Sequence, residues 1–330
     1  MAAKKRILSG MRPTGRLHLG HLVGALSNWV KLQESYQCFY MVADWHALMS
    51  EYENPKDMRE NSYEMVKDFI AAGLDPDKSV IFIQSHVPEH LELYMVFSDL
   101  TPLGWVERCP TYKEQLREIK GRDLTTYGFL GYPVLQAADI ALYKADAVPV
   151  GIDQVPHLEL TREIVRRFNS LYGKAVFPEP EGLLTRTPKL LGLDNRKMSK
   201  SYDNFISLSF RSSDIRVKVA TMITDPSRIK LNDPGHPEVC NVFSYYSIFA
   251  DPDSLAGVRK NCESASQGCT DCKKNLAAIL IERLEPMNLK RAKLSDDDVK
   301  DILKSGARKA RQAAAETMAA VRSLIHFAQE

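Results

Sequence analysis

RILSGMRPTGRLHLGH, residues 6–21, is the stretch that decides the fold. Its first part, residues 6–10, is a short apolar run typical of a buried strand, and residues 11–15 carry the proline and glycine of a turn. Residues 21–36 are then expected to form a helix. A strand, a turn and a helix in this order predict the first unit of a parallel α/β sheet.

The turn leads into His18-Leu19-Gly20-His21 at the start of the predicted helix. Nucleotide phosphates would meet the positive end of a helix dipole and its unpaired N–H groups there. Gly20 has no side chain, so an adenine ring can lie against the backbone. His18 and His21 lie one helical turn apart and can both donate hydrogen bonds to a triphosphate.

A second signature, Lys197-Met198-Ser199-Lys200-Ser201, follows Gly192, Asp194 and Asn195, which predict a mobile loop. Lysines on such a loop can follow the charge that builds on departing pyrophosphate, so they act mainly in the transition state. Taken singly, the first signature could equally be an ordinary turn that carries histidines, and the second could equally be a solvated loop. Together they indicate an enzyme that splits ATP at its α-phosphate, where a substrate carboxylate attacks and no protein nucleophile is needed.

The sequence resembles the class I aminoacyl-tRNA synthetases, and within them the bacterial tryptophanyl-tRNA synthetases, over essentially its whole length. The resemblance rests on PTG and LHLGH within residues 13–21, GYPVLQAADI (131–140), VPVGIDQ (148–154) and KMSKS (197–201). It implies ATP-dependent activation of L-tryptophan with Mg²⁺, transfer of tryptophan to the 3′ end of tRNA(Trp), and a homodimer.

One carboxylate stands out in the second of these motifs. An indole ring is apolar except for one N–H donor, so a selective pocket needs a flat apolar slot with one acceptor at its end. Asp139 lies in an otherwise apolar stretch, and in the family the matching aspartate accepts the indole N–H. A helix-capping or surface aspartate is the other interpretation. The residues expected around tryptophan are Asp139, Tyr132, Gln136, Val148, Val150, Gln154 and His46.

The resemblance also implies the residues that handle ATP. It assigns catalysis to His18, His21, Lys197 and Lys200. Residues 151–154 match the segment that holds the ATP ribose and the amino-acid ammonium, a task that suits a tight glycine turn followed by a carboxylate and an amide. The expected ATP contacts are Arg12, Pro13, Thr14, Gly20, His21, Gly151, Ile152, Asp153, Leu190, Lys197, Met198, Ser199, Lys200 and Ser201.

Two positions depart from many bacterial members, which have Thr-Ile-Gly-Asn as the first motif and methionine in the place of Gln136. Both departures fit a tyrosyl-tRNA synthetase, which is the alternative substrate class; the VPVG before Asp153 and a helical end without an appended RNA-binding module weigh against it. A nucleotidyltransferase would share only the first motif. A non-catalytic paralogue that binds RNA or amino acid would typically lose His18, His21 or Lys200, and all three are present.

The cysteines form a second notable pattern. Cys38 and Cys109 stand alone in apolar surroundings and are expected to be small buried side chains. The other four have the spacing Cys240-x21-Cys262-x6-Cys269-x2-Cys272. No secretory signal precedes the first strand and the apolar runs are too short to span a bilayer, so a cytoplasmic chain with reduced thiols is expected.

Four clustered reduced thiols predict a metal site rather than disulfides. Tetrathiolate coordination suits zinc or an iron–sulfur cluster, and spacing alone does not choose between them. A subset of tryptophanyl-tRNA synthetases carries a [4Fe–4S] cluster on nearly this arrangement, so the resemblance favours the cluster over zinc. We expect it to brace the helical part of the chain and to take no part in adenylate formation.

A length of 330 residues predicts two domains. Strand-like runs at 38–43, 80–84 and 148–151 alternate with amphipathic helical stretches at 55–72 and 158–172, the pattern of a doubly wound parallel sheet. We expect a Rossmann-like catalytic domain over residues 1–203. It contains a mostly helical insertion over about 88–132, whose Trp105, Tyr112 and Tyr127 indicate either a dimer interface, as in the family, or an aromatic core patch.

Residues 204–330 are expected to form an all-helical anticodon-binding domain that ends in an Ala-rich helix over 307–328 and can pack back on the first domain. The net charge of +2 argues against indiscriminate polyanion binding, and DNA and membranes are not expected partners. Candidate tRNA phosphate contacts, each equally well a solvated face, are Lys4, Lys5, Arg6, Arg166, Arg167, Lys304, Arg308, Lys309 and Arg311.

Overall fold

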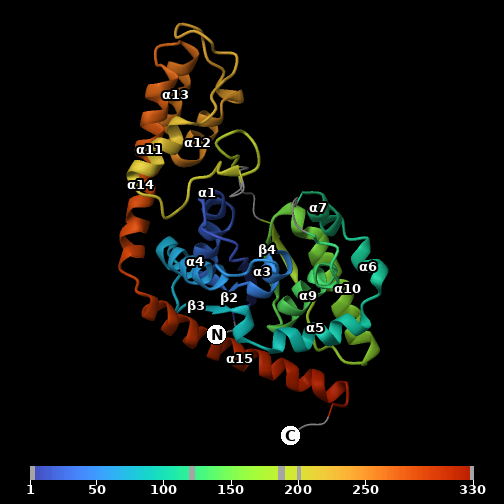
Figure 1. Cartoon of the computed structure of the whole chain (residues 1–330). Helices are drawn as coiled ribbons and strands as arrows, with labels where there is room; N and C mark the ends of the chain where they lie inside the picture. The colour runs from blue at the N-terminus through green and yellow to red at the C-terminus, as the bar shows by residue number, and fades with distance from the viewer. Residues whose placement is uncertain (1–3, 119–122, 185–189, 199–201, 328–330) are drawn as a thin grey trace.

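The computed structural model describes residues 4–118, 123–184, 190–198 and 202–327. A sheet of five parallel strands forms its centre, in the order β3-β2-β1-β4-β5 (Figure 1). The strands are β1 (Arg6–Met11), β2 (Gln37–Val42), β3 (Ser79–Ile83), β4 (Ala147–Val150) and β5 (Glu181–Leu184). The expected doubly wound α/β fold is therefore confirmed.

The switch in strand order lies between β1 and β4, which are adjacent in the sheet through the pairing of Ile7 with Ala147. Crossovers from these strands run to opposite sides, so their carboxyl ends border a crevice where ligands of such folds bind. Four strands agree with the predicted runs to within one residue. Sequence reasoning missed β5, because its four residues, Glu-Gly-Leu-Leu, make no buried apolar run.

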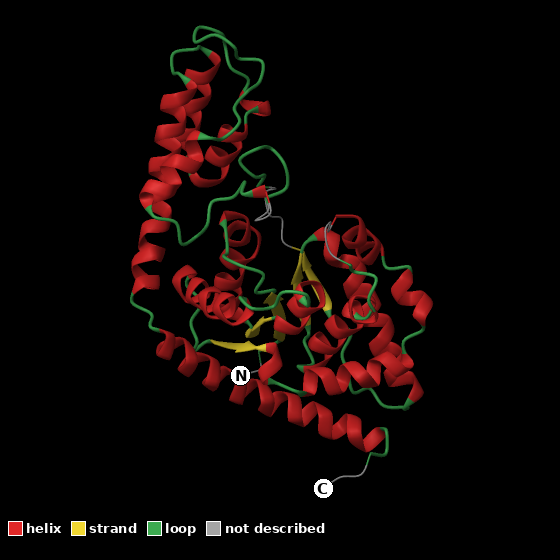
Figure 2. Ribbon diagram, in the orientation of Figure 1, coloured by secondary structure: helices red, strands yellow, loops and turns green. Residues whose placement is uncertain are grey.

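Helices cover both faces of the sheet (Figure 2). In the first half these are α1 (Leu19–His21), the π-helix η1 (Leu22–Leu26), α2 (Ser27–Ser35), α3 (Asp44–Glu51), α4 (Met58–Ala72), the short η2 (Gln84–His86), α5 (Glu89–Leu100), α6 (Leu103–Glu107), α7 (Pro110–Glu118), α8 (Tyr127–Leu130), α9 (Tyr132–Leu142), η3 (Ile152–Gln154) and α10 (Val155–Leu171). After the second signature come α11 (Ser212–Ala220), η5 (Pro237–Val239), α12 (Asn241–Phe249), α13 (Pro252–Glu263), α14 (Cys269–Ala292) and α15 (Asp296–Leu324).

The described parts of residues 88–132 are mostly helical, as expected, and so is the chain after α11. The core lies on the two faces of the sheet. Neighbouring residues of β1 show this, since Ile7 packs in the cluster that contains Trp29, whereas Leu8 packs in the cluster that contains Phe39. Burial on both faces explains why these strands appear in the sequence as continuous apolar runs.

Helix α15 runs along the β3 edge of the sheet (Figure 1). It begins at a capping box, in which the Ser295 hydroxyl accepts from the Asp298 N–H at 3.1 Å and the Asp298 carboxylate accepts from the Ser295 N–H at 2.8 Å. A Cβ on Gly306 would lie 1.8 Å from the carbonyl oxygen of Ile81, so only glycine permits this approach. The helix begins at Asp296, well before the Ala-rich stretch by which the sequence predicted it. The prediction began too late because the first turns of the helix are highly charged.

Ion pairs tie the end of α14 to α4 and to the turn before the first signature. Arg291 donates to the buried Asp68 at 2.9 Å and also pairs with Glu64. Arg16, which follows the Pro-Thr-Gly turn, pairs with the same Glu64 carboxylate. Burial raises the pKa of Asp68 to about 6, although Arg291 opposes that shift. The turn and the helical part of the chain therefore share one anchoring carboxylate.

Candidate active site

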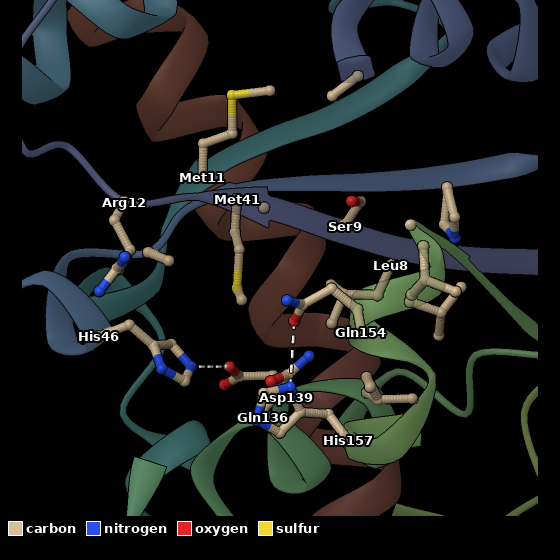
Figure 3. Close-up of a pocket in the computed structure, with 18 of the residues that line it drawn as sticks. Leu8, Ser9, Met11, Arg12, Met41, His46, Gln136, Asp139, Gln154 and His157 are labelled. Atoms are coloured by element: carbon tan, nitrogen blue, oxygen red, sulfur yellow. Dashed lines mark hydrogen bonds and ion pairs between the residues drawn. The ribbon is translucent and has the colours of Figure 1, made fainter. Parts of the chain in front are cut away.

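A cleft of about 630 Å³ lies at the carboxyl ends of β1 and β4, where the strand order switches. All seven residues expected around tryptophan line this cleft. Figure 3 labels His46, Gln136, Asp139 and Gln154 among them. Of the expected ATP contacts, Arg12, Gly20, His21, Gly151 and Asp153 line it too. The remaining described members of that set, Pro13, Thr14, Ile152, Leu190, Lys197 and Met198, are not among its lining residues.

Asp139 lies on α9 with no exposed surface, which excludes the surface interpretation. His46 Nε2 lies 2.7 Å from its Oδ2, whereas Gln84 Nε2 at 2.8 Å and His90 Nδ1 at 2.7 Å both meet its Oδ1. Burial alone would raise the pKa of Asp139, but the hydrogen bond from His46 and the charge of His90 hold it below its ordinary value. The carboxylate is therefore kept ionised inside the protein.

Counting acceptor sites shows what this carboxylate can still bind. Each carboxylate oxygen accepts about two hydrogen bonds. Oδ1 already has Gln84 and His90, whereas the one partner of Oδ2 among the described contacts is His46. Oδ2 therefore retains capacity for one further N–H donor at the wall of the cleft.

Sequence reasoning missed Gln84 and His90. Gln84 directly follows β3, at the carboxyl edge of the sheet, and that position was the available signal. His90 Nε2 also lies 2.8 Å from the Tyr143 hydroxyl, in a fully buried position. No local pattern distinguishes this histidine from an ordinary core residue.

The two histidines of the first signature do not play equivalent parts. His21 lines the cleft, and its Nδ1 accepts the backbone N–H of His18 at 3.2 Å. In a neutral imidazole the proton then resides on Nε2, so Nε2 is the donor. His18 caps α1, and its ring lies against that of His21 with centroids 3.8 Å apart.

The two signatures meet in space. A Cβ on Gly20 would lie 3.0 Å from the His18 ring and 3.5 Å from the sulfur of Met198. The backbone of Leu19 donates to the carbonyl of Ile206 at 3.0 Å, so the chain just after the second signature pairs with the first. Ser199, Lys200 and Ser201 lie outside the described residues.

The second signature is attached to the helical part of the chain through α12. Asn241 donates to the carbonyl of Gly192 at 2.8 Å, and the Tyr245 hydroxyl donates to the carbonyl of Leu191 at 2.7 Å. Within the loop, the Asn204 amide donates to the carbonyl of Lys197 at 3.1 Å. The base of the loop is thus fixed by side chains from outside it.

The side chain of Asp153 occupies space that is open only because residue 151 is glycine. A Cβ on Gly151 would lie 2.6 Å from the Asp153 carboxylate, so glycine leaves the space that this side chain occupies at the end of β4. Gln154 donates to the same carboxylate at 2.9 Å. Ile152 is 84% exposed and is not among the residues that line the cleft.

The four clustered cysteines line a second, small cavity in the helical part of the chain. All four are free thiols, and Arg228 lies 3.9 Å from the sulfur of Cys269. The glycine at 235 is required here, since a Cβ would lie 2.4 Å from the sulfur of Cys262. Within the described residues, however, no group of three or more His, Cys, Asp or Glu side chains could hold a metal ion as it stands.

Comparison with known proteins identifies relatives along nearly the whole chain. Residues 2–285 match the family model of the class I tRNA synthetases (W and Y). A tryptophan–tRNA ligase of Thermotoga maritima is 52% identical and covers 98% of this chain and 99% of its own. One from Deinococcus radiodurans is 41% identical, with 98% of both chains covered.

Solved structures agree. A tryptophanyl-tRNA synthetase of Campylobacter jejuni, in complex with ADP and tryptophan, matches with a TM-score of 0.89 at 34% identity and covers 98% of this chain and all of its own. A tyrosyl-tRNA synthetase of Archaeoglobus fulgidus has a TM-score of 0.67 at 23% identity and covers 87% of this chain and 90% of its own, which shows a shared fold. Among the described residues, every helix is either too short or too polar to span a bilayer.

Proposed function

The chain belongs to the class I tRNA synthetases of the tryptophan and tyrosine type, and we propose that its cleft selects tryptophan through Asp139. It activates L-tryptophan with ATP and transfers the amino acid to tRNA(Trp). ATP enters as its magnesium complex. The observation that carries the selection proposal is the buried, ionised carboxylate with one acceptor site left at the wall of the cleft.

In the first step a tryptophan carboxylate oxygen attacks the α-phosphorus in line, the bond to the bridging oxygen breaks, and pyrophosphate leaves with that electron pair. The protein supplies position and field, and no protein nucleophile is involved. We assign His21 Nε2–H and the lysines of the second signature to the triphosphate. A terminal hydroxyl of tRNA then attacks the carbonyl carbon of the adenylate and releases AMP.

Amino-acid-dependent exchange of pyrophosphate into ATP tests this function directly. Run in parallel, tryptophan should support exchange and tyrosine should not, because the proposal assigns Asp139 to the N–H of an indole, which a phenol does not carry. Exchange with tyrosine alone would establish the tyrosyl alternative. Exchange with neither amino acid would indicate a binding paralogue.

We propose further that Cys240, Cys262, Cys269 and Cys272 hold one [4Fe–4S] cluster. Four free thiols share one cavity, with a guanidinium beside one sulfur, as suits an anionic tetrathiolate cluster. The resemblance to the cluster-bearing subset of the family favours the cluster over zinc.

The cluster would brace α12, α13 and α14, since the cysteines lie at the N-cap of α12, near the end of α13 and in the first turn of α14. The Tyr246 hydroxyl, which donates to the carbonyl of Cys272 at 2.7 Å, joins two of these helices without any metal. This part of the chain is also where we place anticodon recognition.

Cys269→Ser tests the cluster. Anaerobically purified protein should be brown, with about four irons and four sulfides per chain as this cluster type requires, and the variant should be colourless. Because loss of a ligand loosens the surrounding helices first, aminoacylation should fall more than tryptophan-dependent exchange. Cys38→Ser, in the catalytic core, is the control and should keep its iron.

Two results would contradict these expectations. If the anaerobically purified protein is colourless and contains one zinc per chain, the site holds zinc and the cluster assignment is wrong. An equal fall in both activities would mean that the cysteine site acts on adenylate formation, and the hydrogen bonds from α12 to Leu191 and Gly192 provide the route by which it could.

A homodimer through the helical insertion is also proposed. Three large apolar side chains on its helices α5, α6 and α8 are exposed, with Met95 58%, Leu103 59% and Tyr127 79% exposed. A partner chain would cover them, as happens where exposed apolar patches mark protein–protein interfaces. Light scattering should give the mass of two chains, and Leu103→Asp should shift it toward one; a single-chain mass for the unmodified protein would refute the proposal.

A further inference from the structure

His157 is a buried histidine at the back of the tryptophan cleft that nothing so far explains. It lies near the start of α10, is 1% exposed, and lines the cleft with its ring. Its Nε2 lies 2.8 Å from the Thr111 hydroxyl and 2.9 Å from the Tyr132 hydroxyl, and its Nδ1 lies 3.1 Å from Oε1 of Gln154. The ring therefore joins side chains from α7, α9 and η3.

The amide of Gln154 has one orientation that satisfies its neighbours. Its Nε2 donates to the Asp153 carboxylate at 2.9 Å, which accepts only, so the amide oxygen must face His157. Figure 3 shows this contact as a dashed line. Since an amide oxygen is only an acceptor, Nδ1 of His157 must carry a proton.

The other ring nitrogen is then defined as well. Burial lowers the pKa of His157 to about 4, with the nearby His46 acting in the same direction, so the ring is neutral at physiological pH. A neutral imidazole with a proton on Nδ1 accepts at Nε2. The Thr111 and Tyr132 hydroxyls both face this one lone pair, at 2.8 and 2.9 Å. When the Tyr132 hydroxyl donates to it, the phenol oxygen stays an acceptor, and it also receives the Gln115 Nε2–H at 3.2 Å.

We propose that His157 is a positioning residue that fixes the Tyr132 oxygen and the Gln154 amide oxygen as acceptors for the tryptophan ammonium. Both oxygens belong to residues that line the cleft, and both contact the one ring. A charged imidazole would donate from Nε2 and a side chain without nitrogens would accept nothing, so in either case the Tyr132 hydroxyl could present its hydrogen to a cation. The Gln154 amide is also held by Asp153, and His157 adds the second contact that keeps the amide oxygen in place. The inference deepens the proposed function and rests on tryptophan occupying this cleft.

His157→Phe keeps an aromatic ring and removes both nitrogens. Ligands with an ammonium should bind more weakly, by about tenfold for the KM of tryptophan and the inhibition constant of tryptamine in pyrophosphate exchange. Indole-3-propionate has no ammonium, and its inhibition constant should change less than twofold. The kcat of exchange should stay within about threefold, since the ammonium contact is the same in the ground and transition states.

His157→Gln is the conservative variant. Its amide offers an acceptor near the former Nε2, so most of the loss for tryptophan and tryptamine should be recovered. If His157→Phe does not fold, the same two inhibition constants, for tryptamine and for indole-3-propionate, are measured on His157→Asn, whose short amide cannot reach both Tyr132 and Gln154. If the ratio of these two constants in the folded variant equals that of the unmodified protein, the inference is overturned.

The outcomes separate the two levels of the proposal. Equal weakening of tryptophan, tryptamine and indole-3-propionate would mean that His157 merely supports the fold, and the inference would be wrong while the function stands. Failure of the unmodified protein to exchange with tryptophan would instead remove the function on which the inference rests.

Discussion

Asp139→Ala should lower kcat/KM for tryptophan in pyrophosphate exchange by a factor of roughly 30 to 1000, on the order of 2–4 kcal/mol. The indole N–H would lose its acceptor and stay buried without a partner. The loss should be large because the acceptor that is removed is an ionised, fully buried carboxylate. A change of less than threefold would mean that another group selects the indole.

The variant also removes a partner of His46, Gln84 and His90, so general damage must be separated from lost selectivity. The tryptophan analogue with a benzothiophene ring has sulfur in place of the N–H. The unmodified protein should prefer tryptophan to this analogue strongly, and Asp139→Ala should lose most of that preference. Damage to the fold would lower both substrates alike, and thermal unfolding would detect it.

Asp139→Asn is the matched control for size. An amide keeps the volume and one acceptor oxygen, but it presents N–H groups where His46 or the indole requires an acceptor. We expect intermediate loss, with the preference over the benzothiophene analogue reduced and not abolished.

Lys200→Ala should lower the single-turnover rate of tryptophanyl-adenylate formation by about 10²-fold or more, with little change in tryptophan affinity. The ammonium contributes most when negative charge builds on pyrophosphate, so it is a transition-state interaction. Lys200 lies outside the described residues, and the prediction rests on the sequence motif and on Met198, which places the loop beside Gly20. A variant with a normal single-turnover rate would refute the assignment.

Arg196→Gln is the matched control, because it removes a nearby cation that is already neutralised. The Arg196 guanidinium donates to Asp194 at 2.7 Å and lies 4.3 Å from the centroid of the Tyr202 ring. Its loss should change adenylate formation less than about threefold, as for an exposed ion pair. A loss as large as that of Lys200→Ala would indicate that net positive charge on the loop matters, whichever residue carries it.

Residues 6–21 and the apolar runs after them were enough to predict the sheet. Strands buried on both faces are continuous apolar runs, and such runs are visible without any tertiary information. The motifs also led to the seven residues expected around tryptophan and to five of the expected ATP contacts that line the cleft, since the carboxyl ends of parallel strands meet at one edge of a sheet. Strand β5 was not predicted, because it is a strand through its pairing with β4 and its own sequence has no strand pattern.

Only the tertiary structure decided how the site is held. Gln84 and His90 fix one oxygen of Asp139 from positions 55 and 49 residues away in the sequence, and His157 contacts Tyr132 across 25 residues. The physical reason is that a buried polar group must be satisfied by whichever donors and acceptors the packing brings to it. Local sequence motifs predict the groups that contact substrate. The residues that support those groups belong to separate elements, so only the folded structure identifies them.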